Sequence, residues 1–237
     1  MNIALILAAG SGSRMGNADK PKQFLPIYGK PLMLHTIEAF EVHEEVDAIV
    51  IVTNQDYVDQ VKVWCKQYDL LKVKAVVAGG NERQISVYNG LQAVKKIAKS
   101  DSDIVLIHDA ARPLISQRII TDNIRVCEKY DACDTVIKAS DTIVRSNNDE
   151  SITDIPLRKE LYQGQTPQTF KLNIILDAHE HAIKNNLPDV TDDAKLVLSL
   201  GKEVRLVQGS KQNFKITTFD DLMMLKALLK IGRAEVL

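Results

Sequence analysis

Short apolar runs alternate with longer amphipathic stretches along this chain, and this alternation restricts the possible folds more than any other feature. Most of the apolar runs have no polar face, which is typical of strands that helices cover on both sides. In chain order the runs are Ile3–Ala8, Ala48–Thr53, Lys74–Ala78 and Ile104–His108, and the helical stretches between them are Pro31–Val42, Asp56–Gln67 and Glu82–Lys99. This order of strands and helices predicts an α/β protein with a mostly parallel sheet.

The pattern changes between Asp134 and Leu161, where two β-rich pieces flank the polar tip SNNDE. This arrangement is typical of a β-hairpin. An isolated hairpin is marginally stable in water, so we expect it to pack against a second copy of the chain. The α/β pattern then resumes with helices at Leu172–Lys184, at TDDAKLVLSLG up to Gly201 and from about Phe219, a strand at Glu203–Gln208, and the segment FKIT. We therefore expect a single domain over residues 1–237 with a protruding hairpin arm, at about 138–160, that forms a homodimer.

The composition excludes several classes of protein. The chain has 237 residues, of which 45% are hydrophobic and 26% charged, and its net charge is −1. No broad basic field is available, so neither nucleic acid nor a membrane surface is an expected partner, and any anion site must be local. No apolar run approaches the roughly 20 residues of a membrane span, and IALILAAG resembles a buried strand more than a signal peptide. Three cysteines without a CxxC pair fit a reducing cytoplasm.

A glycine-rich segment, LILAAGSGSRMGNADKPKQF, follows the first apolar run. Its glycines (Gly10, Gly12 and Gly16) miss the spacing of the dinucleotide fingerprint by one residue, and no G-K-[ST] closes the loop. Arg14 lies in the loop and Lys22 beyond it. Glycines let backbone N–H groups approach phosphate, and the two cations suit a nucleoside triphosphate. AGGNER follows the third run and HDAARP ends the fourth, so all three segments are expected at the carboxyl edge of the sheet, where such folds bind ligands.

The chain resembles the cytidylyltransferases that act on 2-C-methyl-D-erythritol 4-phosphate or D-ribitol 5-phosphate. The resemblance runs from end to end, through LAAGSGSRMG, PKQF, AGGNERQISVYNGL, HDAARP, DTIV, LYQGQTPQTF, VTDDAKLV and FKITTFDDL. It implies a three-layer Rossmann-like nucleotidyltransferase fold, CTP as the nucleotide substrate, and Mg²⁺ as the cofactor. No protein nucleophile is needed, because the acceptor phosphate itself attacks the α-phosphorus of CTP.

The resemblance also implies the roles of individual residues. Arg14, Lys22 and Lys215 are expected to be catalytic, and Asp109 to hold Mg²⁺ as well as contact CTP. The remaining CTP-binding residues are expected to be Ala8, Ala9, Gly10, Gly12, Gly80, Asn81, Arg83, Ser86 and Ala110. The acceptor is expected to contact Arg112, Thr142, Arg158, Thr166, Thr191 and Asp192, with Thr142 and Arg158 reaching it across a dimer. His108 is interpreted as a packed residue, and Asn81 also suits a helix cap.

The two acceptors are distinguished by the arm and its surroundings. Three segments look most like the ribitol-phosphate enzymes: CDTVIKASDTIVRS, RPLISQRIITDNI and ITDIPLRKELYQGQTPQTF. Two others, HDAARP and VTDDAKLV, resemble the methylerythritol enzymes at least as well. We expect D-ribitol 5-phosphate as the acceptor and CDP-ribitol with pyrophosphate as the products, serving the synthesis of teichoic acid or a capsule polymer. 2-C-methyl-D-erythritol 4-phosphate, an isoprenoid precursor, is the alternative acceptor.

Two readings from other classes also fit parts of the sequence. A nicotinamide-dependent oxidoreductase would also have a strand followed by G-x-G. It requires an acidic residue at the end of the second strand, however, and that strand here ends in VTN. A nucleotide-binding regulator without turnover would not need the set of cations together with Asp109.

Overall fold

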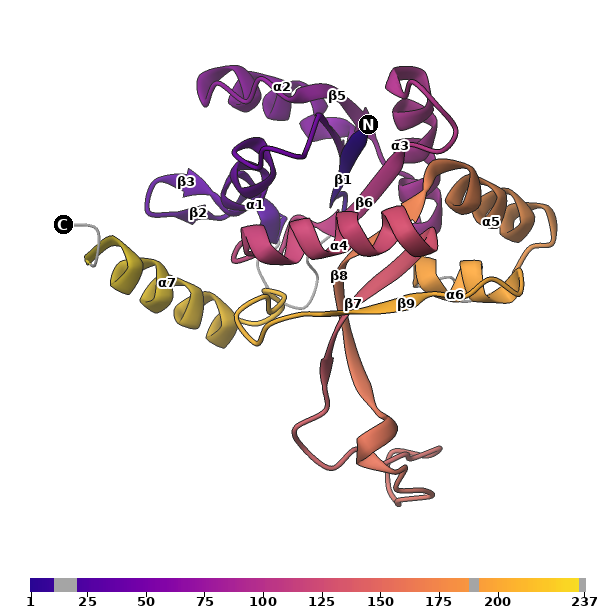
Figure 1. Ribbon diagram of the computed structural model, residues 1–237. Helices are drawn as coiled ribbons and strands as arrows, with labels where there is room; N and C mark the ends of the chain where they lie inside the picture. The colour runs from indigo at the N-terminus through magenta and orange to yellow at the C-terminus, as the bar shows by residue number, and fades with distance from the viewer. Residues whose placement is uncertain (11–20, 188–191, 235–237) are drawn as a thin grey trace.

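The computed structural model describes residues 1–10, 21–187 and 192–234. Seven of the strands that it describes form one sheet in the order β5-β4-β1-β6-β8-β7-β9 (Figure 1). They are β1 (Asn2–Ala8), β4 (Ala48–Thr53), β5 (Val73–Ala78), β6 (Ile104–Asp109), β7 (Ala132–Lys138), β8 (Tyr162–Lys171) and β9 (Arg205–Gln208). Only β8 runs against its neighbours, which confirms the mostly parallel sheet.

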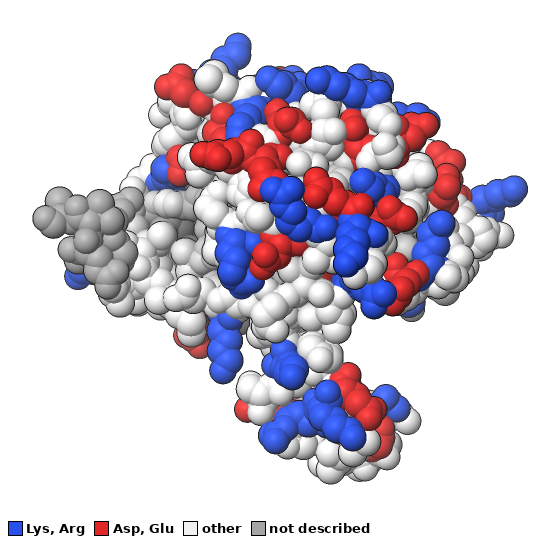
Figure 2. All heavy atoms as spheres, viewed as in Figure 1, with Lys and Arg blue, Asp and Glu red and all other residues white. Residues whose placement is uncertain are grey.

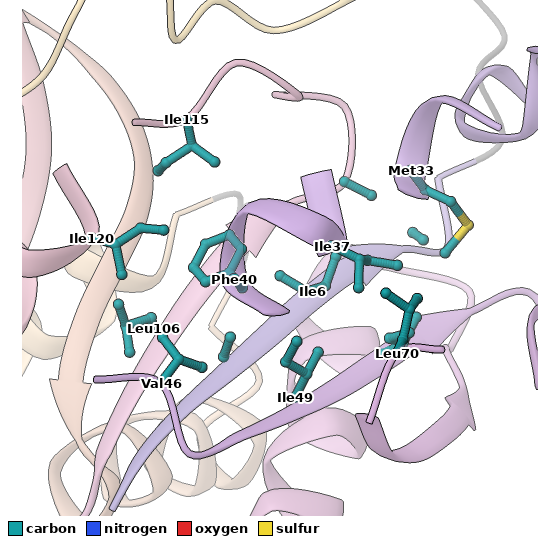
Figure 3. Close-up of a cluster of buried hydrophobic side chains, with 14 of the residues drawn as sticks. Ile6, Met33, Ile37, Phe40, Val46, Ile49, Leu70, Leu106, Ile115 and Ile120 are labelled. Carbon is teal, nitrogen blue, oxygen red and sulfur yellow. The ribbon is translucent and has the colours of Figure 1, made fainter. Parts of the chain in front are cut away.

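Helices cover both faces of this sheet and produce three layers (Figure 1). Strand β1 shows why: Ala4 and Ile6 are buried on one face, and Ile3 and Leu5 on the other. The first face packs against α1 (Leu32–Glu41), α2 (Val58–Gln67) and α4 (Gln117–Tyr130), as Figure 3 shows in part. The second packs against α3 (Arg83–Ile97), α5 (Leu172–Lys184) and α6 (Asp193–Ser199).

A third, smaller core joins the two ends of the chain. The short hairpin of β2 (Pro26–Ile27) and β3 (Lys30–Pro31) packs with α7 (Phe219–Ala234) through Ile27, Ile216 and Leu225, which are all fully buried. Short 3-10 helices lie at Lys22–Phe24 (η2), Gln55–Tyr57 (η3) and Arg158–Glu160 (η4). Among the described residues, no helix combines the length and the apolar character that crossing a bilayer requires.

Local predictions were wrong at three points. The helix predicted from Pro31 begins at Leu32 as α1, and Pro31 belongs to β3 instead. Glu82, not Asn81, is the N-cap residue of α3, and its side chain makes no capping bond. FKIT is not a strand: the N–H of Ile216 donates to the carbonyl of Ala111 at 2.8 Å, so this segment crosses the carboxyl edge of the sheet instead of joining it.

The arm leaves the sheet between β7 and β8 and projects away from the three layers (Figure 1). Residues 139–161, all of which the structure describes, contain a single β-bridge, Arg145 with Asp154. The antiparallel ladder of the hairpin is thus concentrated at its base, where β7 pairs with β8. Side chains of the arm expose considerable apolar surface, at Ile143, Val144, Ile152, Ile155 and Leu157.

Candidate active site

A cavity of about 410 Å³ opens at the carboxyl edge of the parallel strands. The end of β1, the loop after β5 and the end of β6 form its walls, as expected for an open α/β sheet. The predicted residues that line it are Ala8, Ala9, Gly10, Lys22, Gly80, Asn81, Arg83, Ser86, Asp109, Ala110 and Lys215. Gly12, Arg14 and Thr191 lie outside the described residues, so their roles stay predictions.

Gln23 fixes the backbone at the start of the glycine-rich loop. Its side-chain amide donates to the carbonyl of Ala8 at 2.6 Å and to that of Gly10 at 2.8 Å. Gln23 is buried in η2 and lines the cavity. Gln23 was not among the predicted site residues, although it directly follows Lys22 in the glycine-rich segment. Its two bonds hold the end of β1 against the segment that carries Lys22.

The loop after β5 approaches the end of β1 very closely. A Cβ atom at Gly79 would lie 2.6 Å from the Cβ of Ala9, so only glycine fits there without a shift. The N–H of Gly80 donates to the hydroxyl oxygen of Ser86 at 3.0 Å, and this hydroxyl donates to the carbonyl of Glu82. The hydroxyl of Ser86 therefore holds the loop in shape around the cavity.

Asp109 lies at the centre of the charged groups. Its Oδ2 atom is 2.8 Å from the ammonium of Lys215 and 3.7 Å from Nε of Arg112. Burial would raise the pKa of this carboxyl, but the charges of Lys215, Arg83 and Arg112 outweigh it and hold the pKa far below its usual range. Asp109 is therefore ionised at physiological pH.

The two predicted catalytic lysines reach the cavity from one side. FKIT carries Lys215, and Lys22 donates to the carbonyl of Ile216 at 2.8 Å, in the same segment. The crossing of FKIT over the strand ends thus brings Lys22 and Lys215 together although they lie far apart in the sequence. Both line the cavity, and Lys215 is 39% exposed.

A buried group of polar side chains stands behind Arg83. Nη2 of Arg83 donates to Oδ2 of Asp193 at 2.6 Å, and Nε2 of His179 lies 3.0 Å from the other oxygen of this carboxylate. Asp193 and His179 are both fully buried. Of the two aspartates in VTDDAKLV only the first, Asp192, was a predicted site residue, and His179 was not predicted at all.

Of the residues predicted to bind the acceptor, the five that the structure describes do not line the cavity. The hydroxyl of Thr166 accepts the N–H of Asp109 at 3.1 Å and lies 2.9 Å from Nδ1 of His108, whose burial lowers its pKa to about 4. Arg112 donates to the carbonyl of Asn213, and Asp192 caps α6. Thr166 and Arg112 thus contact Asp109 in the cavity wall, Asp192 precedes Asp193 behind Arg83, and His108 is packed, as interpreted.

Thr142 and Arg158 lie on the arm, exposed and away from the cavity of their own chain. Arg158 is in η4 and donates to the carbonyl of Ser140 at 3.4 Å. Nothing in the isolated chain tests their predicted contact with an acceptor.

Asp109 is suited to hold Mg²⁺ together with a triphosphate. The described residues include no group of three histidine, cysteine, aspartate or glutamate side chains that could enclose a metal. Mg²⁺ is usually bound through one or two carboxylates plus phosphate oxygens, and Asp109 is an ionised carboxylate in the wall of the cavity. The donor set thus fits a metal that enters with its nucleotide.

Charge on the face of the molecule drawn in Figure 2 is mixed rather than concentrated. Figure 2 shows lysine and arginine interspersed with aspartate and glutamate over the visible face. Lys22, Arg83 and Lys215 in the cavity wall supply positive charge locally.

Known proteins match the chain along nearly its full length. The sequence model of the family "IspD: 2-C-methyl-D-erythritol 4-phosphate cytidylyltransferase" matches residues 2–231. The chain belongs to this family. A ribitol-5-phosphate cytidylyltransferase of Lactiplantibacillus plantarum is 42% identical over 97% of this chain and 99% of its own. A ribitol-5-phosphate cytidylyltransferase of Streptococcus agalactiae serotype III is 40% identical over 96% of this chain and 95% of its own.

Solved structures of the family confirm the fold. The 4-diphosphocytidyl-2C-methyl-D-erythritol synthase of Anaerococcus prevotii superimposes with a TM-score of 0.82, at 29% identity, over 97% of this chain and 98% of its own. The described cavity therefore belongs to a CTP-dependent nucleotidyltransferase, and the oxidoreductase and regulator readings are set aside.

Proposed function

We propose that this protein transfers the cytidylyl group of CTP to D-ribitol 5-phosphate, releasing pyrophosphate and CDP-ribitol. The choice of acceptor rests on the sequence identity to known enzymes. Ribitol-5-phosphate cytidylyltransferases match at 40–42%, whereas the solved methylerythritol-type enzymes match at 25–29% over a comparable length of this chain. A common fold with different identity is what a change of acceptor on a shared CTP site would produce.

In the proposed reaction an oxygen of the ribitol phosphate attacks the α-phosphorus of CTP. A new P–O bond forms as the bond to the β-phosphate bridging oxygen breaks, and the electron pair leaves with pyrophosphate. The protein must bring together two anions that repel each other and stabilise the charge that builds up on the phosphorus. One pair of unit charges 4 Å apart contributes about 4 kcal/mol at an effective dielectric constant near 20. Lys22 and Lys215, in the cavity wall, supply that charge, and Arg14 is proposed to add to it.

Asp109 is proposed to hold Mg²⁺ with the triphosphate. The metal, when bound, neutralises phosphate charge and orients the pyrophosphate leaving group. Lys215 lies 2.8 Å from the same carboxylate, so Asp109 also fixes the position of a catalytic cation. Ala8, Ala9, Gly10 and the loop at Gly80 are proposed to contact the nucleotide through their backbone.

The arm is proposed to mediate a homodimer and to complete the acceptor site of the partner. Its exposed Ile143, Val144, Ile152, Ile155 and Leu157 provide apolar surface that a second copy would bury. Thr142 and Arg158 would then reach the acceptor phosphate from the neighbouring subunit, beside Arg112, Thr166, Thr191 and Asp192. An arginine suits that task because its planar fork forms two parallel bonds to phosphate. CDP-ribitol made in the cytoplasm would serve teichoic acid or capsule polymers.

A pyrophosphate-release assay with CTP, Mg²⁺ and both acceptors tests the proposal. We expect D-ribitol 5-phosphate to give the higher kcat/KM, because a pocket shaped for an unbranched chain rejects the methyl branch of 2-C-methyl-D-erythritol 4-phosphate by steric overlap. Replacing CTP with ATP at equal concentration controls for the nucleotide. A higher kcat/KM for the methylerythritol compound would reverse the choice of acceptor, and no turnover with either would refute the reaction.

A further inference from the structure

Arg83 presents one side of its guanidinium to a fixed carboxylate. It is the first residue of α3, it lines the cavity, and its Nη2 atom donates to Oδ2 of Asp193 at 2.6 Å. Its Nη1 atom is shielded from solvent and has no hydrogen-bond partner in the part of the chain that the structure describes. A buried donor without a partner costs free energy. An acceptor atom on a molecule in the cavity would remove that cost.

Asp193 is itself held from several sides. Nε2 of His179, on α5, lies 3.0 Å from Oδ1, and the backbone N–H of Asp193 donates to Oε1 of Gln168, on β8, at 3.1 Å. Burial would raise the pKa of the Asp193 carboxyl, but the charge of Arg83 and the hydrogen bonds from His179 and Arg83 keep it below its usual range. The carboxylate is therefore ionised, and His179 donates its Nε2 proton to it.

This group is poorly explained by stability alone. A buried ion pair is often no more stabilising than apolar residues of similar volume. What it provides instead is a fixed geometry, because Arg83 projects from α3 while Asp193 and His179 belong to α6 and α5. Three helices thus determine where one guanidinium lies.

We propose that Asp193, supported by His179, is a positioning residue that orients the guanidinium of Arg83 toward the nucleotide in the cavity. The inference rests on the proposed function of this cavity as the CTP site. Asp193 does not line the cavity itself and acts through Arg83, which does. A negative charge next to the site thereby assists the binding of an anion, contrary to what its sign alone would predict.

Calorimetric titration of CTP with Mg²⁺ into four variants tests this role. Asp193→Asn keeps the shape of the side chain and is expected to raise the Kd of CTP about tenfold. In an Arg83→Gln background, the same change is expected to alter the Kd less than twofold, because the residue through which it acts is absent. Asp103→Asn is the matched control: Asp103 is also a buried ion-paired aspartate, but it lies at the amino end of β6, bound to the terminal amine. It is expected to leave the Kd unchanged.

Steady-state kinetics add a second readout. KM for CTP should rise in Asp193→Asn much more than KM for the polyol phosphate, a split that general loosening of the fold would not produce. If Asp193→Asn does not fold, His179→Phe serves instead, with an expected rise in the Kd of CTP of about threefold. His179→Gln, which retains a donor, should restore the wild-type Kd.

An unchanged Kd in soluble His179→Phe or Asp193→Asn, or an equal effect with and without Arg83, overturns the positioning role alone. A wild-type protein that does not bind CTP refutes the proposed function, and this inference with it.

Discussion

Replacing Asp134 with asparagine should stabilise this protein at alkaline pH. Asp134 lies on β7, partly buried, and its Oδ1 atom is shielded from solvent with no hydrogen-bond partner among the described residues. Burial raises the pKa of this carboxyl to about 7, and the negative charges of Asp192 and Asp193 add to the rise. The amide of Gln168 and the charge of Arg112 offset it in part.

The direction of the pH dependence follows from these values. The unfolded chain loses the Asp134 proton near pH 4, whereas the folded chain keeps it up to about pH 7. Between these two pH values the folded state binds a proton that the unfolded state has lost, so raising the pH reduces stability. The full difference corresponds to a ceiling of about 4 kcal/mol at pH 8. We expect about half of it, roughly 2 kcal/mol, because the side chain is only partly buried and water screens the charge.

Urea unfolding of wild type and Asp134→Asn at pH 5 and pH 8 measures this effect. Asparagine has nearly the same shape and no charge, so the variant should be about 2 kcal/mol more stable than wild type at pH 8. At pH 5 the gain should be less than half as large, because that pH lies only about one unit above the pKa of Asp134 in the unfolded chain. In a thermal scan, that gain corresponds to a rise in Tm of about 4–8 °C for a chain of this size. Asp103→Asn is the opposite control. Hydrogen bonds to the terminal amine and to two backbone N–H groups lower the pKa of Asp103 despite its burial, so this variant should lose stability at pH 8. Destabilisation by Asp134→Asn at pH 8, or the same gain at both pH values, would refute the reasoning.

Three further predictions concern the reaction and the assembly. Lys22→Ala should lower kcat by about two to three decades with an unchanged circular dichroism spectrum, because one lost donor at a developing charge has that effect; near-normal turnover would exclude Lys22 from the chemistry. Asp109→Asn should be severely impaired and wild type inactive in excess EDTA, since this carboxylate is the proposed magnesium ligand; full activity in EDTA would exclude a metal. Deleting Val144–Thr153 should convert a dimer to a monomer in light scattering and abolish turnover; an unchanged mass would contradict the arm as the dimer contact.

The sheet could be predicted because its strands are buried on both faces and therefore consist of unbroken apolar runs. The observed Ala48–Thr53 strand has the predicted bounds, and the other three predicted parallel strands are correct to within one residue at each end. The cavity could be predicted for a related reason, since residues at the carboxyl ends of parallel strands must share one edge. The conformation of FKIT could not be predicted, because an extended segment with apolar residues looks like a strand in the sequence. Only the structure shows that the N–H of Ile216 donates to a loop carbonyl instead of to a neighbouring strand.

The missed residues share a different property. Gln23, His179 and Asp193 act through contacts that depend on the finished fold, such as the bond between Arg83 and Asp193, which joins α3 to α6. Nothing in the spacing of a sequence reveals that two such side chains will meet. The sequence held one partial signal for Asp193, its place next to Asp192 in VTDDAKLV. The structure separates the two, because Asp192 caps α6 and Asp193 is fully buried.

The pairing of cations with carboxylates explains how this site could bind a triphosphate without a basic surface. Lys215 lies against Asp109, and Arg83 against Asp193, so neither cation moves freely before a ligand arrives. A free lysine or arginine side chain loses about 2 kcal/mol of rotamer entropy when it is fixed. The carboxylates fix these side chains before the ligand binds, so much of that entropy is already lost. Their negative charge also reduces the attraction of the site for an anion. The balance favours binding where the carboxylate is turned away from the ligand, as Asp193 is behind Arg83. It also favours binding where the carboxylate is shared with a metal, as proposed for Asp109. Neutralising either carboxylate is therefore expected to weaken the binding of CTP with Mg²⁺, although each substitution makes the site more positive.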